Sequence, residues 1–215
     1  MSGIATATKK LADITQPYDV KIVGTRKTLL NYFDKKAIKV GGGLPHRMGL
    51  YDAIMIKDNH LEAIREEGIE NEIETAIERA YAVADRYKPN FIEIEVSTLN
   101  DTIKAANKFK EIVYRKANEF FEDPRLEPKA KYEYIHTMPN IIMLDNMKPS
   151  EIKKTVKELK KQNLYDFVLL EASGGITEKN IKQYAATGVD AISIGAITHS
   201  VKALDISQKI VKRES

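Results

Sequence analysis

The sequence predicts an α/β protein whose strands are parallel and buried on both faces. Short runs rich in Ile and Val alternate along the 215 residues with longer amphipathic stretches, as expected for α/β proteins. The apolar runs mostly lack in/out alternation, which is typical of strands covered on both sides. The longer stretches place apolar residues three and four positions apart, which favours helices with one buried face.

The predicted strands are residues 20–23, 37–40, 53–56, 91–96, 141–144, 167–170 and 191–194. Two helical stripes lie between them, formed by Ile69, Ile73, Ile77, Ala80 and Ala84 and by Ile152, Val156 and Leu159. Residues 202–212 indicate a closing helix. Seven strands fit either a (β/α) barrel or a doubly wound sheet; a barrel would be compact or incomplete, because about 250 residues are typical. The charged, proline-containing segment 108–139 interrupts this rhythm, and we expect a helical extension followed by a loop.

Composition excludes several classes of protein. The 34 Lys and Arg residues and 31 Asp and Glu residues give a net charge of +3, which does not favour nucleic acid as a partner. The absence of cysteine excludes disulfides, thiolate zinc sites and cysteine nucleophiles. No apolar run approaches the length of a membrane span or forms a signal peptide, so we expect a cytoplasmic protein without a membrane partner.

Cationic side chains follow three of the predicted strands. Arg26 and Lys27 come after the first run, His46 and Arg47 after the second, and Lys57 after the third. Functional side chains of parallel α/β folds lie just beyond the C-terminal ends of strands. Solvated charge is the usual fate of Lys and Arg, but three groups at strand ends favour a site for phosphate, pyrophosphate or a dicarboxylate.

Carboxylates follow the middle strands. Glu93 and Glu95 share a face of one strand, Asp145 follows the next, and Glu171 the one after. A network of ion pairs inside a barrel is the structural alternative, and it suits Glu93 best. Glu95 and Asp145 are the better candidates for Mg²⁺, for a ribose or for a developing cation.

Small residues follow the last two strands. Ser173 and Gly174 begin one loop, and Gly195 begins the other. Backbone N–H groups of such loops commonly hold a phosphate in barrels, although each glycine alone could mark a plain turn. The residues thus predict a barrel that binds a phosphorylated anion. They do not identify its reaction, and they leave a non-catalytic binding protein open.

Taken together, these motifs resemble the quinolinate phosphoribosyltransferase family. The resemblance rests on Thr25-Arg26-Lys27-Thr28, Gly41-Gly42-Gly43 with His46-Arg47, Ile56-Lys57-Asp58-Asn59-His60, Leu144-Asp145-Asn146-Met147, Glu171-Ala172-Ser173-Gly174-Gly175 and Gly195-Ala196-Ile197-Thr198-His199. It runs from Ser2 to about Lys209, interrupted by residues 108–139.

The resemblance implies a fold, a reaction and partners. The fold would be an incomplete, TIM-like (β/α) barrel spanning residues 1–215, without the α/β sandwich domain that precedes the barrel in the family. The reaction would convert quinolinate and 5-phosphoribosyl-1-pyrophosphate, with Mg²⁺, into nicotinate mononucleotide, pyrophosphate and CO₂ in NAD synthesis. The family implies a homodimer or a higher oligomer, and we expect apolar surface around Ile4, Leu11 and Ile14 to be exposed.

The resemblance also implies roles for individual residues. Arg26, His46, Arg47 and Lys57 would surround the pyridine dicarboxylate, with Lys27 beside them toward the phosphates. Glu95 and Asp145 would face the ribose and Mg²⁺. We expect Lys57, Glu95 and Asp145 to be the catalytic residues. The 5′-phosphate site would be formed by Ser173, Gly174 and Gly195, with His199 close by.

Two other functions remain open at this point. One is a related molybdenum-locus protein with a similar barrel, which the intact Lys57-Asp58-Asn59-His60 disfavours. The other is a catalytically silent barrel that serves as a binding or assembly module. Retention of all the cations disfavours this second alternative.

Overall fold

Six parallel strands form the centre of the protein. The computed structural model describes residues 1–28, 30–122 and 138–210. The strands are β1 (Lys21–Val23), β2 (Ile54–Ile56), β3 (Ile92–Val96), β4 (Asn140–Asp145), β5 (Leu169–Ser173) and β6 (Ala191–Ser193). They pair in the order β1-β6-β5-β4-β3-β2, all in parallel.

The strand order is that of a barrel opened along one seam. Strands β2 to β6 are neighbours in chain order, and β1 closes back onto β6. Among the described residues β1 and β2 do not pair, and one isolated bridge from Val23 to Leu44 lies on this side. The predicted α/β fold with an incomplete barrel of parallel strands is therefore confirmed. The doubly wound sheet is excluded because its strand order reverses at a switch point.

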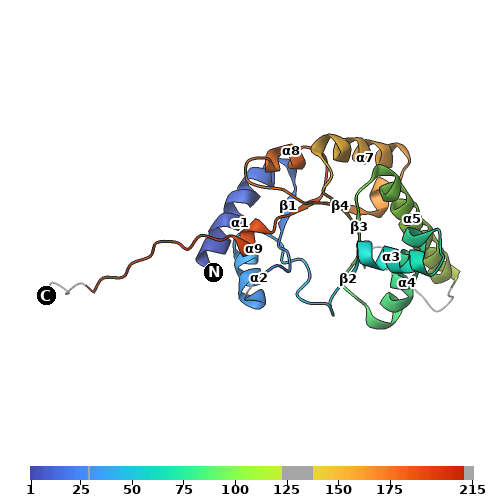
Figure 1. Ribbon diagram of the computed structural model, residues 1–215, viewed down its shortest axis with the longest axis horizontal. Helices are drawn as coiled ribbons and strands as arrows, with labels where there is room; N and C mark the ends of the chain where they lie inside the picture. The colour runs from blue at the N-terminus through green and yellow to red at the C-terminus, as the bar shows by residue number, and fades with distance from the viewer. Residues whose placement is uncertain (29, 123–137, 211–215) are drawn as a thin grey trace.

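Helices cover the outer face of the strands. They are α1 (Ser2–Thr15), α2 (Asn31–Val40), α3 (Asp58–Glu66), α4 (Glu72–Tyr87), α5 (Leu99–Glu122), α7 (Pro149–Lys161), α8 (Ile181–Ala185) and α9 (Ala196–His199), with short 3₁₀ turns η1 (Gln16–Tyr18) and η2 (Tyr165–Phe167). Helices α1, α8, α7 and α5 follow one another as an arc around the sheet (Figure 1). None of the helices described is long and apolar enough to cross a membrane.

The core lies between the strands and this outer layer of helices. Ile92, Ile94, Ile142 and Leu170 are fully buried on the strands. The predicted stripes are confirmed on α4 from Ile73 onward and on α7, where Ile73, Ile77, Ile152 and Leu159 are buried to 1% exposure or less. Ile69 precedes α4 and is partly buried. Each such buried side chain stabilises the fold by roughly 1.5–3 kcal/mol relative to an exposed position. This packing fixes the strand ends from which the candidate site is built.

The strand predicted at residues 37–40 is wrong. These residues form the last turn of α2, which ends where the Gly41 N–H donates to the Ala37 carbonyl. Ala37 and Ile38 are buried, whereas Lys39 and Val40 are exposed, as expected for a helix with one buried face. A run as short as Ala37-Ile38-Lys39-Val40 does not distinguish a strand from a turn of a half-buried helix.

Two further predictions need correction or restriction. The helical extension expected at the start of segment 108–139 is confirmed over residues 108–122, which belong to α5 and in which Phe109 and Ile112 are fully buried. Residues 123–137 of this segment lie outside the described residues. The closing helix predicted at 202–212 is wrong over 202–210, because these residues form no helix and extend away from the body (Figure 1).

Candidate active site

One cavity of about 690 Å³ lies at the C-terminal ends of the strands. It brings together every site residue that the sequence predicts: Arg26, Lys27, His46, Arg47, Lys57, Glu95, Asp145, Ser173, Gly174, Gly195 and His199. They come from seven segments that are far apart in the chain. The parallel arrangement of the strands explains this convergence, because all their C-terminal ends open at the same side.

The cationic part of the cavity has an exposed and a buried component. Arg26 and Lys27 follow β1 and are exposed, and neither forms an ion pair with the residues described. Arg47 is only 8% exposed, and its guanidinium lies 3.5 Å from the Ala53 carbonyl and 3.4 Å from the Met55 sulfur. Arg26 and Lys27 are therefore free to meet an anion, while Arg47 is already held in place.

Lys57 and Glu95 form an ion pair across two neighbouring strands. Lys57 follows β2, Glu95 lies on β3, and the Lys57 ammonium donates to the Glu95 carboxylate. The Lys57 N–H also donates to the His60 ring at 2.9 Å, which fixes the start of α3. Lys57 is thus directed across the cavity, and it neutralises one of the two carboxylates predicted to face a ribose.

Glu95 and Asp145 are the predicted Mg²⁺ ligands. Asp145 is partly buried at the end of β4, and the Asn146 side chain donates to it at 2.6 Å. Within the residues described, no third His, Asp or Glu joins these two carboxylates to form a converging ligand group. Mg²⁺ commonly takes one or two protein carboxylates and completes its shell with water and substrate phosphates. The pair fits an ion of that kind, delivered with a diphosphate.

A buried acid–imidazole cluster lies beneath the cavity. The His46 Nε2 atom is 2.9 Å from a Glu93 oxygen and 3.7 Å from a Glu171 oxygen. Glu93 is fully buried on β3 and Glu171 is 2% exposed on β5. Burial is the main cause that raises the pKa of Glu93 to about 8 and the pKa of Glu171 to about 7. Burial also lowers the pKa of His46. Burial therefore favours the protonated form of both carboxyl groups and the neutral form of the imidazole.

The loop after β5 requires glycine at its turn. Gly174 has a φ of +92°, and a Cβ there would come within 2.2 Å of the Asn146 side-chain oxygen. The Asn146 N–H donates to the Ser173 carbonyl at 2.9 Å, so the loops after β4 and β5 are joined. Both the left-handed backbone and the close approach exclude a larger residue at position 174.

The last loop is tied to the first. The Thr198 hydroxyl of α9 donates to the Lys27 carbonyl at 2.7 Å. A Cβ on Gly195 would meet the His199 ring at 3.0 Å, so the ring covers this glycine closely. The predicted phosphate loops and the cationic loop are therefore one continuous wall of the cavity.

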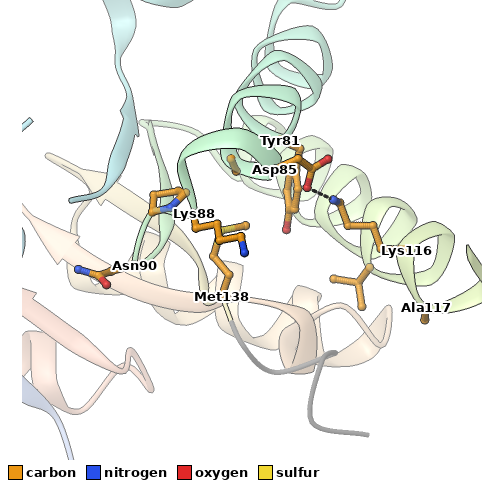
Figure 2. A pocket seen from close by; sticks show the side chains of 10 residues that line it. Tyr81, Asp85, Lys88, Asn90, Lys116, Ala117 and Met138 are labelled. Atoms are coloured by element: carbon orange, nitrogen blue, oxygen red, sulfur yellow. Dashed lines mark hydrogen bonds and ion pairs between the residues drawn. The ribbon is translucent and has the colours of Figure 1, made fainter. Parts of the chain in front are cut away.

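A second cavity, of about 480 Å³, lies near the N-terminal ends of β3 and β4 (Figure 2). Its walls come from α4, α5 and the segments that lead into β3 and β4, and Lys116 forms an ion pair with Asp85 there. None of the predicted site residues lines it. Met138, on its rim, directly follows residues 123–137, which the structure does not describe. This cavity gives no sign of converging reactive groups.

The cationic residues Arg26, Lys27, His46, Arg47 and Lys57 form what we call the cationic wall of the cavity. Sequence reasoning missed Lys35, a fully buried lysine behind this wall. The pair Lys35-Lys36 reads as solvated charge. Helical spacing could have found it, since Lys35 stands three positions before the buried Ile38 and one after the buried Asp34.

The fold and the cavity define a class of protein, an incomplete (β/α) barrel with cationic, acidic and small residues gathered at its strand ends. Within that class, the model of the quinolinate phosphoribosyl transferase C-terminal domain matches residues 4–209, and the chain belongs to this family.

Relatives of this chain in several organisms are named nicotinate-nucleotide pyrophosphorylase or quinolinate phosphoribosyltransferase. A probable nicotinate-nucleotide pyrophosphorylase (carboxylating) of Archaeoglobus fulgidus is 36% identical over 99% of this chain and 68% of its own length. A namesake from Methanothermobacter thermautotrophicus is 36% identical over 98% of this chain and 63% of its own length. A mitochondrial quinolinate phosphoribosyltransferase (decarboxylating) of Nicotiana tabacum is 37% identical over 98% of this chain and 53% of its own. The chain thus spans between about half and two thirds of these relatives.

Solved structures agree with the fold. The nicotinate-nucleotide pyrophosphorylase of Francisella tularensis superposes with a TM-score of 0.72 at 31% identity, covering 96% of this chain and 59% of that one. NadC from Streptococcus pyogenes gives a TM-score of 0.69, also at 31% identity, over 97% of this chain and 59% of that one.

Proposed function

We propose that this barrel transfers the phosphoribosyl group of 5-phosphoribosyl-1-pyrophosphate to the ring nitrogen of quinolinate and removes one carboxyl group. The products are nicotinate mononucleotide, pyrophosphate and CO₂. The observation that carries the proposal is the single cavity in which cations, two carboxylates and two small-residue loops meet. Membership of the family supports the same reaction.

The two carboxylates of quinolinate would bind to the cationic wall. Arg26 and Arg47 offer guanidinium groups, which pair with planar carboxylates through two parallel hydrogen bonds. His46 and Lys57 line the same side, and Lys27 extends it toward the phosphates. Because Arg26 and Lys27 are exposed and without an ion-pair partner among the described residues, their charge is available to a dianion.

In the transfer step, the ring nitrogen forms a bond to the ribosyl carbon as pyrophosphate leaves. Positive charge develops on the ribosyl centre, and carboxylates fixed beside it stabilise that charge. We assign this role to Glu95 and Asp145, which line the cavity at the ends of β3 and β4. Lys57 forms an ion pair with Glu95, which orients this carboxylate and partly neutralises its charge until the substrate binds.

Mg²⁺ would neutralise the leaving diphosphate. Glu95 and Asp145 are the residues that would hold it, with the remaining ligands drawn from phosphate oxygens and water. Ser173, Gly174 and Gly195 would position the 5′-phosphate through their loops, and His199 lies against Gly195 at the same place.

Loss of CO₂ leaves an electron pair on the ring carbon next to the alkylated nitrogen. That nitrogen and the surrounding cations stabilise the pair until a proton replaces the lost carboxyl group. The cationic wall therefore serves two steps, because it first binds the dicarboxylate and then stabilises the negative charge left on the ring.

The proposal extends to a homodimer or higher oligomer in the cytoplasm. Large apolar side chains border the seam of the barrel and are exposed: Leu30, Tyr32, Phe33, Leu50 and Tyr51. The surface expected around Ile4, Leu11 and Ile14 is not an exposed patch, because Ile4 and Leu11 are buried and Ile14 is partly buried against the core. A second copy of the chain, covering residues 30–51, would account for the apolar surface that remains.

A turnover assay tests the proposal. The purified chain is incubated with quinolinate, 5-phosphoribosyl-1-pyrophosphate and Mg²⁺, and nicotinate mononucleotide is quantified by chromatography. We expect product formation that Lys57→Ala abolishes and that Lys39→Ala, an exposed change on α2, leaves intact. A folded chain that binds neither substrate would instead favour the silent barrel.

A further inference from the structure

Lys35 is a buried charge without a place in the proposed reaction. It lies on α2 and is 1% exposed; Lys35 and Arg47 are the two basic side chains that are buried among the residues described. It does not line the cavity, so it cannot touch a substrate there. A buried ammonium is costly unless it is paired and hydrogen-bonded, which calls for a reason within its contacts.

The contacts of Lys35 lead to the loop that carries His46 and Arg47. Its ammonium donates to the carbonyl of Pro45, the residue directly before His46. Asp52, near the end of the same loop, attracts the charge, whereas Arg26 and Arg47 oppose it. Burial is the main cause that lowers the pKa of Lys35 to about 8. Lys35 therefore stands behind the cationic wall and holds one of its loops.

That loop needs to be held. His46 has a φ of +55°, a left-handed backbone conformation that is uncommon for residues other than glycine. In this conformation its ring points inward to Glu93 and Glu171. Such conformations persist only when the surrounding structure fixes them from several sides.

Helix α2 fixes this loop on the far side of His46 as well. The Asn31 side chain donates to the Met48 carbonyl at 2.7 Å, and Asp52 accepts from the N–H groups of Met48 and Gly49. Lys35 and Asn31 thus clamp the backbone just before and just after the His46-Arg47 pair.

We propose that Lys35 is a positioning residue, whose ammonium holds the Pro45 carbonyl so that His46 and Arg47 face the cavity in the geometry that a pyridine dicarboxylate requires. The dicarboxylate part of this inference rests on the proposed function. Its structural part, that Lys35 places His46, does not.

Two measurements on the full chain test the proposal separately. The first is the titration of the His46 ring by NMR without ligand, in the wild type, Lys35→Met, Lys35→Gln and the exposed control Lys36→Met. The charged groups that face this ring are Lys35, Arg47, Asp52, Glu93 and Glu171. We expect the pKa of His46 to rise in Lys35→Met, because a neighbouring positive charge is lost and the ring becomes more exposed to water. Lys36→Met should titrate as the wild type does.

The second measurement is the affinity for quinolinate by calorimetry. Lys35→Met should bind quinolinate at least about tenfold more weakly, the scale expected when one charged hydrogen bond is lost. Lys35→Gln keeps a donor for the Pro45 carbonyl and should recover part of the affinity, whereas Lys36→Met should not change it.

The outcomes are distinguishable. A folded Lys35→Met with an unchanged His46 titration and unchanged quinolinate affinity would overturn the proposal. If neither Lys35→Met nor Lys35→Gln folds, as judged by circular dichroism, Lys35 serves the stability of the core and the proposal is also wrong. If the wild type does not bind quinolinate, the proposed function fails, and the His46 titration still decides whether Lys35 positions that ring.

Discussion

Arg26 and Arg47 contribute to the cavity in different ways because their surroundings differ. Arg26 is exposed and takes part in no ion pair with the residues described, whereas Arg47 is buried and rests on the Ala53 carbonyl. Removal of Arg26 therefore tests ligand binding with little effect on the fold. Removal of the Arg47 side chain would also create a buried cavity and leave the Ala53 carbonyl without this hydrogen-bond donor.

We predict that Arg26→Ala weakens quinolinate binding by roughly 1.5–3 kcal/mol, about tenfold to a hundredfold, as for a lost hydrogen bond to a charged group. Nicotinate, with one carboxylate, should bind far more weakly than quinolinate to the wild type and lose less in the variant. Calorimetric titration with both ligands measures this, and Lys39→Ala serves as an exposed control. Equal affinity of the wild type for the two ligands would contradict the assignment.

The pKa of Glu171 predicts a dependence of stability on pH. Its carboxyl takes up a proton on folding, because burial raises its pKa from 4.5 to about 7. The stability that this protonated group provides is full below pH 4.5 and is lost as the pH rises through about 7.

We therefore predict that Glu171→Gln, which mimics the neutral acid, gains unfolding free energy relative to the wild type as the pH rises from 4.5 to 7. The gain should reach about 3 kcal/mol at most. Denaturant unfolding at several pH values measures it, with the exposed change Glu66→Gln as control. A difference that stays constant with pH would show that Glu171 is ionised throughout.

The residues of the cavity were predictable because of where they stand in the chain. Arg26, Lys57 and Asp145 each follow an apolar run, and parallel strands bring such positions together. The contact of His46 with Glu93 and Glu171 was not predictable, since it depends on the depth to which a side chain enters the barrel. The burial of Lys35 was not predictable, because it depends on which face of α2 packs against the barrel. The sequence pattern predicts a strand over residues 37–40, which are part of that helix.

At the scale of elements, α2 stands where a seventh strand was expected. Its residues Asp34, Lys35, Ala37 and Ile38 are buried, which is the spacing of a helix and not of a strand. The segment of 37–40 is too short to distinguish the two by pattern alone. The consequence is functional, since α2 holds the loop with His46 and Arg47 through side chains that a strand there would not supply.

The loop after β5 allows a matched pair of glycine variants. Gly174 and Gly68 both have positive φ, +92° and +80°, but a Cβ would clash with Asn146 at position 174 and meet nothing within 4 Å at position 68. We predict that Gly174→Ala weakens phosphate binding at least about tenfold while Gly68→Ala does not, and that both lose stability through the backbone, Gly174→Ala the more because of its clash with Asn146. Titration with inorganic phosphate compares them, and equal losses of affinity would remove the phosphate site from this loop.

At the scale of the whole molecule, the barrel is open between β1 and β2, and the exposed apolar side chains of residues 30–51 lie on that side. Tyr51 is 82% exposed and Leu50 is 72% exposed, next to the loop that carries the cationic wall. Exposed apolar patches of this kind commonly mark interfaces.

We predict that the chain forms dimers in sedimentation velocity and that Tyr51→Lys shifts them toward monomers. Tyr87→Lys alters a tyrosine of similar exposure, 65%, at the end of α4 and should leave the dimer intact. A monomeric wild type, or equal effects of the two variants, would remove residues 30–51 from the interface.

We propose that one cavity joins phosphoribosyl transfer to decarboxylation. The most direct measurement is the release of CO₂ from quinolinate labelled in the carboxyl group next to the ring nitrogen. It is followed in the presence and absence of 5-phosphoribosyl-1-pyrophosphate, with Mg²⁺ throughout. We expect one CO₂ for each nicotinate mononucleotide, none without the phosphoribosyl donor and none with Lys57→Ala. Release of CO₂ without the donor, or none under any condition from a chain that binds both substrates, would contradict this proposal.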